Sequence, residues 1–288
     1  CTRDHPAQGR NTGDREERHV HEEQVAAAIE ASLWDMEPEH LRAGVTLIDQ
    51  PDRLLWAGDV DSPYASKVVR VDFAEEDAGR QVDEIIAWFR RHGRPFSWWV
   101  GPSSRPASSP ALLEGRGLRL LDRYEGVALR LDGQPSGGGS EPIEPCPGVT
   151  VEPVEDEAGV RAMVRVNSRV WGYPVEAEDR LVAERLAYLR LPGRRGGSLL
   201  ARVDGEVAGT ASYRFSGDGQ AIYLVGAATL PEFRGRGVFR TLVAWRLRQA
   251  RARGCRVATC LARENTSAPI LRRLGFTRYF MMPVYTGP

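Results

Sequence analysis

A nine-residue segment in the C-terminal half, residues 231–239, constrains the fold of this chain more than any other feature. It reads PEFRGRGVF, follows an apolar run typical of a strand (222–230) and precedes a run with helical periodicity (238–251). A glycine-rich turn between a strand and a helix presents consecutive backbone N–H groups at the helix start, where an anion is stabilised. The segment therefore predicts an α/β unit that binds a pyrophosphate group.

Length and composition limit the possible partners. The chain has 288 residues, enough for two domains, and its 42% hydrophobic and 27% charged residues are typical of a soluble protein. Its formal net charge is zero, which gives no indication of a nucleic-acid partner. No apolar run approaches the ~20 residues that span a bilayer. Because Lys67 is the only lysine, we interpret the arginine content as a coding bias and give weight only to arginines in a defined motif.

The cysteines indicate a reducing compartment. Cys1, Cys146, Cys255 and Cys260 have neither the spacing of metal ligands nor that of a disulfide framework. Cys255 and Cys260 are expected on one strand, five residues apart, with their side chains on opposite faces. Since the N-terminal residues also lack the pattern of a signal peptide, we expect a cytoplasmic protein without a metal site.

A change of composition near the middle divides the chain. Residues 132–148 read DGQPSGGGSEPIEPCPG, which is typical of a linker. Residues 1–19 are polar and charged, as in a disordered tail. We therefore expect a tail (1–19), a first domain (20–132), a linker (133–148) and a second domain (149–288).

The two halves share a pattern. Residues 109–118 read SPALLEGRGL and residues 267–276 read SAPILRRLGF, and each segment follows a helix that ends in a glycine. Both halves then run helix, glycine, strand, helix, glycine, strand, which favours duplication of one domain over two unrelated units with similar turns. Before its helix, however, the first half has three carboxylates at residues 75–77. They would repel a phosphate, so the first half is not expected to hold an equivalent site.

At residue level the second half resembles the GNAT superfamily of acyl-CoA-dependent N-acyltransferases. Arg234 to Val238 match the family's loop, with Phe239 where Gly or Ala is usual. In the family's second motif, the matching residues are Asn265, Ala268, Leu271, Leu274, Gly275 and Phe276, and Arg272 replaces the usual tyrosine. With the first half as a degenerate copy, the chain is similar to tandem-GNAT proteins. The resemblance implies two GNAT-like domains, each a mixed twisted sheet flanked by helices, with a V-shaped opening in the second.

The resemblance also implies a cofactor site and a reaction. The cofactor would be acetyl-CoA or another acyl-CoA, and the acceptor a small-molecule or peptide amine. Asn265 is also expected to cap the last helix. The cofactor-binding residues implied are Ala227, Ala228, Thr229, Arg234, Gly235, Arg236, Gly237, Val238, Phe239, Asn265, Ala268 and Arg272.

The groups that would transfer protons are not evident in the sequence. Acyl transfer needs a positioned thioester, an oxyanion donor, a base and an acid for the leaving thiol. The strand before the loop carries no carboxylate, and Arg272 cannot donate a proton at neutral pH. Tyr285, Glu264 and Cys260 are the candidates for catalysis, although core packing is the commoner role for Tyr285 and Cys260, and a solvated surface position the commoner one for Glu264.

Two other interpretations remain open. The chain could bind acyl-CoA without turnover, as a sensor or interaction module. Its first half could instead be a protein-interaction domain, since Trp98 and Trp99 are adjacent on one predicted strand and face opposite sides. The sequence does not distinguish a monomer from a homodimer.

Overall fold

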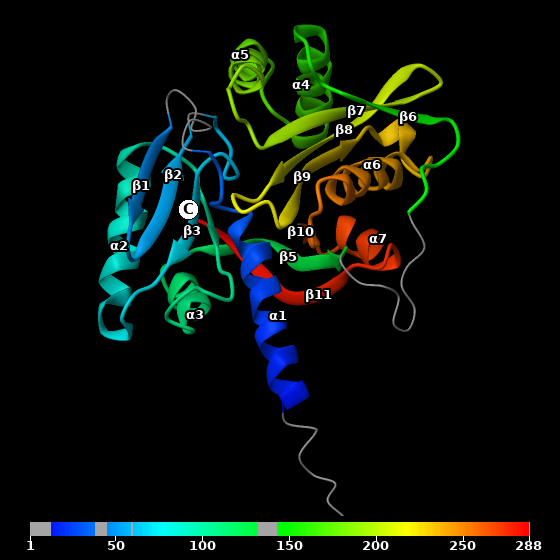
Figure 1. Cartoon of the computed structure of the whole chain (residues 1–288). Helices are drawn as coiled ribbons and strands as arrows, with labels where there is room; N and C mark the ends of the chain where they lie inside the picture. Colours follow the sequence, from blue (N-terminus) through cyan, green and yellow to red (C-terminus); the bar gives the residue numbers. More distant parts are fainter. Residues whose placement is uncertain (1–12, 38–44, 59, 132–142, 288) are drawn as a thin grey trace, which may run out of the picture.

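The computed structural model describes all residues except 1–12, 38–44, 59, 132–142 and 288. The expected α/β class is confirmed, because the strands of the described residues form one mixed sheet with helices on both faces (Figure 1). The elements of the first half are α1 (Gly13–Ala31), β1 (Thr46–Gln50), β2 (Arg53–Ala57), β3 (Lys67–Val71), α2 (Glu75–Arg91), β4 (Ser97–Trp99), α3 (Ser109–Glu114) and β5 (Arg119–Arg130).

The second half continues the sheet. Its elements are β6 (Val149–Pro153), α4 (Glu157–Trp171), the short helix η2 (Val175–Ala177), α5 (Glu178–Leu189), β7 (Gly196–Val203), β8 (Glu206–Phe215), β9 (Ala221–Thr229), the short helix η3 (Pro231–Phe233), α6 (Val238–Ala252), β10 (Val257–Arg263), α7 (Ser267–Arg273) and β11 (Thr277–Thr286). The order α2–β4–α3–β5 recurs as α6–β10–α7–β11, which is the repeated pattern predicted from the sequence.

The two halves exchange their last strands. The sheet order is β1-β2-β3-β4-β11-β5-β10-β9-β8-β7-β6. Strand β11 of the second half pairs with β4 and β5, and β5 of the first half pairs with β10. In Figure 1 the red end of the chain accordingly runs into the first half. The predicted domains are continuous segments of the sequence, whereas strands from both segments pair with one another in the sheet.

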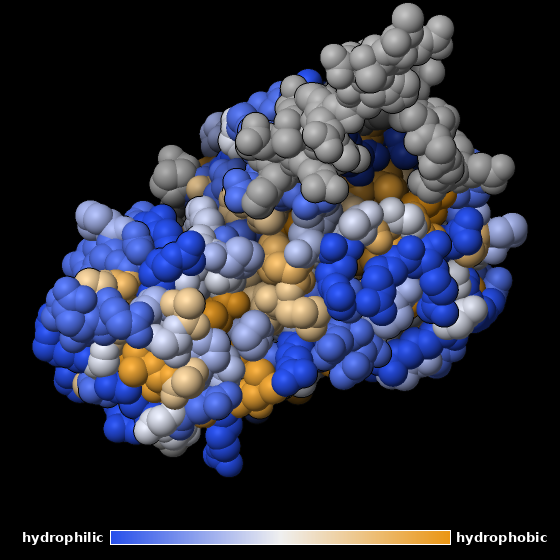
Figure 2. All heavy atoms as spheres, turned by 90° about the horizontal axis from the view of Figure 1, so that it is seen from below, coloured by the Kyte–Doolittle hydropathy of each residue, from blue (hydrophilic) through white to orange (hydrophobic). Residues whose placement is uncertain are grey.

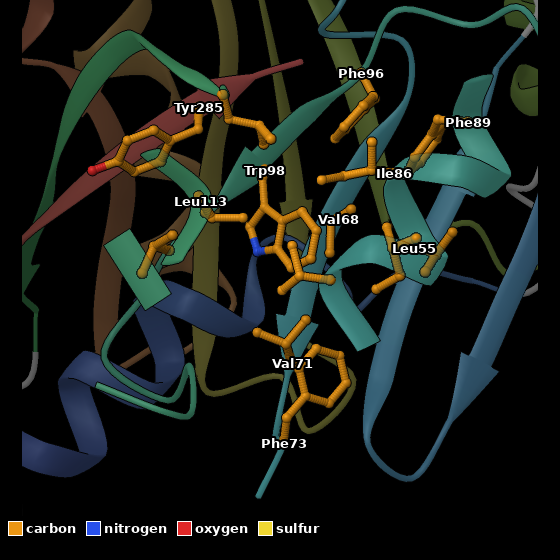
Figure 3. Close-up of a cluster of buried hydrophobic side chains, with 14 of the residues drawn as sticks. Leu55, Val68, Val71, Phe73, Ile86, Phe89, Phe96, Trp98, Leu113 and Tyr285 are labelled. Atoms are coloured by element: carbon orange, nitrogen blue, oxygen red, sulfur yellow. The ribbon is translucent and has the colours of Figure 1, made fainter. Parts of the chain in front are cut away.

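The core of the first half lies between the sheet and helices α2 and α3. Trp98 lies in the middle of this cluster, which also contains Val68, Phe89 and, from β11, Tyr285 (Figure 3). Trp99 packs in a different cluster on the opposite face, with Met282 of β11. The two tryptophans therefore face opposite sides, as predicted, and both are buried.

Helix α1 crosses the junction of the two halves. Its Val25 and Ile29 are buried in a cluster with Ala128 of β5, Tyr223 of β9 and Val257 of β10. The helix begins at Gly13, so residues 13–19 are helical and do not belong to a disordered tail; residues 1–12 of that tail lie outside the described residues.

Seen from below, apolar residues lie between two more hydrophilic areas of the molecule (Figure 2).

The end of the predicted linker is packed against the second half. Ile143 is buried in a cluster with Val127 and Leu247, and the Cys146 N–H donates to Thr241 Oγ1 at 2.9 Å. Residues 143–148 therefore have fixed contacts with α6, while residues 133–142 lie outside the described part of the chain.

Candidate functional site

Strands β9 and β10 diverge after a short parallel ladder. They are matched only from Ala221, opposite Val257, to Tyr223, opposite Thr259. On its other side β9 stays paired with β8 as far as Thr229, with a register shift at Gly226, whose φ is +45°. An extra residue of this kind bends a strand. The sheet therefore opens between β9 and β10, as the resemblance implied.

The glycine loop lies at the open end of β9. After η3 the chain passes through Gly235 and Gly237, with φ of +78° and +79°, and α6 begins at Val238. Gly237 is the residue that precedes the helix and has no side chain to bond the first N–H groups. The first turn of α6, which is described in full, contains no acidic residue. This end of the helix is therefore suited to an anion.

The two arginines of the loop differ in their contacts. Arg234 is exposed and forms no ion pair within the described part of the chain. Arg236 forms an ion pair with Asp204 at 2.6 Å, and both side chains are largely in solvent. Exposed pairs of this kind contribute about 0–1 kcal/mol, so an incoming phosphate can compete for Arg236.

Phe239, the departure from the family's loop, is accommodated by the core. Its half-buried side chain packs against the cluster that contains Val243 and Leu247. The ring therefore lies with the apolar contacts between α6 and the sheet, which explains why this position can hold Phe.

Cys146 lies directly against the loop. A Cβ added at Gly237 would meet the Cβ and Sγ atoms of Cys146. Thr241 Oγ1 accepts from Cys146 N and donates to Gly237 O at 3.0 Å, which ties the two segments together. No local pattern in the sequence indicates this neighbour, because the contact joins residues far apart in the chain.

The other predicted cofactor residues fall into two groups. Ala227, Ala228 and Thr229 lie on β9 beyond the register shift, in the stretch that β10 does not pair. Asn265 is exposed in the turn after β10, but Thr266 occupies the capping position and no side chain caps α7. The expected capping by Asn265 is therefore wrong. Ala268 lies on α7 and is fully buried in the core that this helix covers.

Arg272 forms an ion pair with a residue of the first half. Its Nη1 lies 2.8 Å from Glu125 Oε1, and Glu125 on β5 is only 2% exposed. Glu125 Oε2 has no hydrogen-bond partner among the described residues. The sequence held a signal for this residue, because Glu125 shares its face of the strand with the buried Val127 and Leu129.

The structure does not gather the three candidates for catalysis. Cys260 lies on β10 beside the opening, where burial raises the pKa of its thiol to about 11 although the guanidinium of Arg246 opposes this shift. Glu264 follows the end of β10, and its N–H donates to Arg123 O at 3.0 Å. Tyr285 lies in the core of the first half, where its hydroxyl donates to Glu114 Oε1 at 3.2 Å and burial raises its pKa.

Two further residues differ from expectation. Cys255 precedes β10, so it does not alternate with Cys260, and both side chains contact the same apolar cluster. Arg246 of α6 was not predicted as a site residue, yet it is fully buried and donates to Ser212 O beside the register shift. Burial lowers the pKa of Arg246 to about 10.

Two further features, a metal-binding cluster and a membrane-spanning helix, are not found among the described residues. No three His, Cys, Asp or Glu side chains gather there as ligands of a metal ion. Among the same residues, no helix combines the length and the apolar composition that crossing a membrane requires.

Residues 162–276 match the family model of the acetyltransferase (GNAT) family. Comparison with curated proteins gives no match. Among solved structures, a GCN5-related N-acetyltransferase from Kribbella flavida is 20% identical, with a TM-score of 0.65 over 92% of this chain and 95% of that one. A tandem GNAT protein from the clavulanic acid biosynthesis pathway is 14% identical, with a TM-score of 0.61 over 94% and 96% of the two chains. A GCN5-related N-acetyltransferase from Sphaerobacter thermophilus is 19% identical, with a TM-score of 0.60 over 83% and 82%. At these identities the likeness establishes the fold, and it confirms a tandem arrangement of two GNAT-like halves.

Proposed function

Since residues 162–276 form a domain of the GNAT acetyltransferase family, we propose that this protein transfers an acyl group from acyl-CoA to an amine. Acetyl-CoA is the proposed donor, and a small-molecule or peptide amine the proposed acceptor. The observation that carries this proposal is the divergence of β9 from β10 beside a glycine loop at the start of α6. The loop offers a site for a diphosphate, and the divergence leaves one edge of β9 without a neighbouring strand.

The reaction would use these features in sequence. The N–H groups at the start of α6, with Arg234, would hold the diphosphate of CoA. A backbone N–H of residues 227–229 would stabilise the oxyanion on the thioester carbonyl. The amine nitrogen would then bond to the carbonyl carbon as the C–S bond breaks, and the proton lost by the amine would end on sulfur.

The test begins with calorimetry of CoA binding. Reversing both loop charges (Arg234→Glu with Arg236→Glu) is expected to weaken CoA affinity at least about tenfold, because it replaces attraction by repulsion at the phosphates. The control is the pair Arg90→Glu and Arg91→Glu, two exposed residues at the end of α2. Equal affinity of both double variants, or no binding heat for the unaltered chain, would contradict the proposal. Thiol release from acetyl-CoA with a panel of amines then tests the reaction.

A second candidate is a protein that binds acyl-CoA without turnover. It is favoured by the scattered positions of Cys260, Glu264 and Tyr285. Tight CoA binding with no thiol release across the amine panel would support this alternative. The free Cys146, Cys255 and Cys260 support a reducing compartment, so we propose a cytoplasmic location for either function.

A further inference from the structure

Glu125 is a buried carboxylate in which one of the two oxygens has a partner and the other has none among the described residues. Oε1 is paired with Arg272, whereas Oε2 has no partner among the described residues and the residue is 2% exposed. The Arg272 side chain is 43% exposed. The buried Glu125 carboxylate is therefore paired with a partly exposed guanidinium, and the other N–H donors of Arg272 can reach a ligand.

The pair lies beside the opening in the sheet. In the register of β5 and β10, Glu125 is opposite Ala262, in the part of β10 beyond its last match with β9 at Thr259. The next residues of its face, Val127 and Leu129, pack in one cluster with Leu247 of α6 and Leu271 of α7. Glu125 and Arg272 thus lie on the same side of the sheet as the helix that follows the glycine loop.

Stability does not account for this ion pair. Removing the Glu125 carboxylate from water is costly, and replacing a buried charge pair with apolar residues is often neutral or stabilising. A buried carboxylate oxygen without a hydrogen-bond partner adds a further cost, because it has lost its water without gaining a donor. A functional reason for the pair is therefore worth testing.

We propose that Glu125 holds Arg272 so that its guanidinium faces the sulfur of the acyl donor and stabilises the thiolate that leaves. This inference rests on the proposed function. As the amine forms its bond to the carbonyl carbon, the electron pair of the C–S bond passes to sulfur, and the amine proton follows to give the free thiol. Arg272 is the catalytic residue and Glu125 the positioning residue. The first half therefore contributes to the reaction through its exchanged strand β5.

The test measures the thiol pKa of CoA bound to the full chain, from the ultraviolet absorbance of the thiolate. We expect this pKa to lie about one unit or more below that of free CoA, which is a tenfold gain in thiolate at fixed pH. Arg272→Met should remove the shift and Arg272→Lys should keep part of it. Arg273→Met, at the exposed neighbour on α7, should leave it unchanged. Arg246 of α6, Cys260 of β10 and Glu264, which follows β10, are other titratable groups near the opening, and they are unaltered in all of these variants.

Two more variants separate this role from a structural one. Arg272→Met alone leaves a buried charge unpaired and can unfold the protein. The double variant Glu125→Leu with Arg272→Met avoids that cost, so it should fold and bind CoA but lack the shift. With an amine acceptor it should lose about tenfold or more in kcat with little change in KM for acyl-CoA. In Glu125→Gln the guanidinium of Arg272 should no longer be held near the sulfur, so the thiol pKa should rise. If Glu125 acted only through its negative charge, removing that charge would lower the thiol pKa instead.

The outcomes are distinct. A double variant that binds CoA and keeps the wild-type thiol pKa overturns the role of the pair while the proposed function stands. A fall of the thiol pKa in Glu125→Gln overturns the positioning role of Glu125. Failure of the unaltered chain to bind CoA overturns both proposals.

Discussion

Two residues of the glycine loop have nearly the same positive φ and different surroundings. Gly235 and Gly237 both have φ near +78°, a region that L side chains rarely adopt. A Cβ at Gly235 would meet no atom within 4 Å, whereas one at Gly237 would meet Cys146. The backbone strain is therefore shared, and the packing against residues 143–148 is specific to Gly237.

This difference predicts unequal effects of two alanine substitutions. Gly235→Ala should cost about 1–2 kcal/mol through backbone strain alone. Gly237→Ala should cost about 1–3 kcal/mol more, because Cys146 must move. Urea unfolding of both variants measures the difference. Equal stabilities would mean that the side chain of Cys146 leaves room for a Cβ at position 237.

The same contact makes Cys146 a reporter of the cofactor. If CoA binds at this loop, it should slow alkylation of the half-buried Cys146 severalfold, because the thiol lies against Gly237. Cys260 should react slowly with or without CoA, since burial raises its pKa to about 11 and the thiolate is the reactive form. Mass analysis of the labelled peptides follows both residues. A Cys146 rate that is unaffected by saturating CoA would place the cofactor elsewhere.

At the scale of elements, the turn that follows α1 is hydrogen-bonded to the second half through Asp35. Asp35 accepts hydrogen bonds from Arg195, Tyr223 and the backbone N–H of Gly217. Burial alone would raise the pKa of Asp35, but these three donors outweigh it and hold the pKa below the usual 3.8. The ionised form is therefore the one that stabilises the junction.

This shift fixes the sign of a pH dependence. A carboxyl whose pKa is lower in the folded state adds stability above its unfolded pKa and loses it as the pH falls through the folded value. Asp35→Asn should therefore cost about 1–3 kcal/mol at pH 7, as hydrogen bonds to a charged group are lost. The difference from the unaltered chain should shrink once the pH falls below 3.8, as unfolding at several pH values would show. A cost that stays constant well below pH 3.8 would contradict the role of the charge.

For the molecule as a whole, strand exchange joins the halves into one folding unit. Without β5 the sheet of the second half loses the strand between β10 and β11, and without β11 the first half loses Tyr285 from its core. Neither half can complete its sheet from its own strands. This arrangement differs from two domains joined by a linker, in which each half would keep its own last strand.

The exchange predicts that neither half folds alone. Residues 143–288 expressed by themselves should lack stable structure, because β10 and β11 would each expose an unpaired edge and an apolar face. The same fragment expressed together with residues 1–142 should form a complex with the circular dichroism of the intact chain. Size-exclusion chromatography of the single and paired fragments gives the comparison. A folded, monomeric 143–288 fragment would show that the exchange is dispensable.

The sequence by itself determined the local features of this protein. The strand, glycine loop and helix at residues 221–252, and the repeated order of elements in the two halves, depend on hydrophobic periodicity and on glycines that act over a few residues. These features were enough to predict the fold class and the position of the loop, and a capping role for Asn265 failed because the helix starts one residue later.

Only the tertiary structure decided which distant residues meet. The contact of Cys146 with Gly237 and the ion pair between Glu125 and Arg272 join segments about 90 and 150 residues apart, which no local pattern specifies. Both depend on where the chain passes after each half, and the second depends on β5 being inserted beside β10. Strand order is set by burial and pairing over the whole sheet, so residues of the first half enter the candidate site of the second for a reason that the sequence alone does not show.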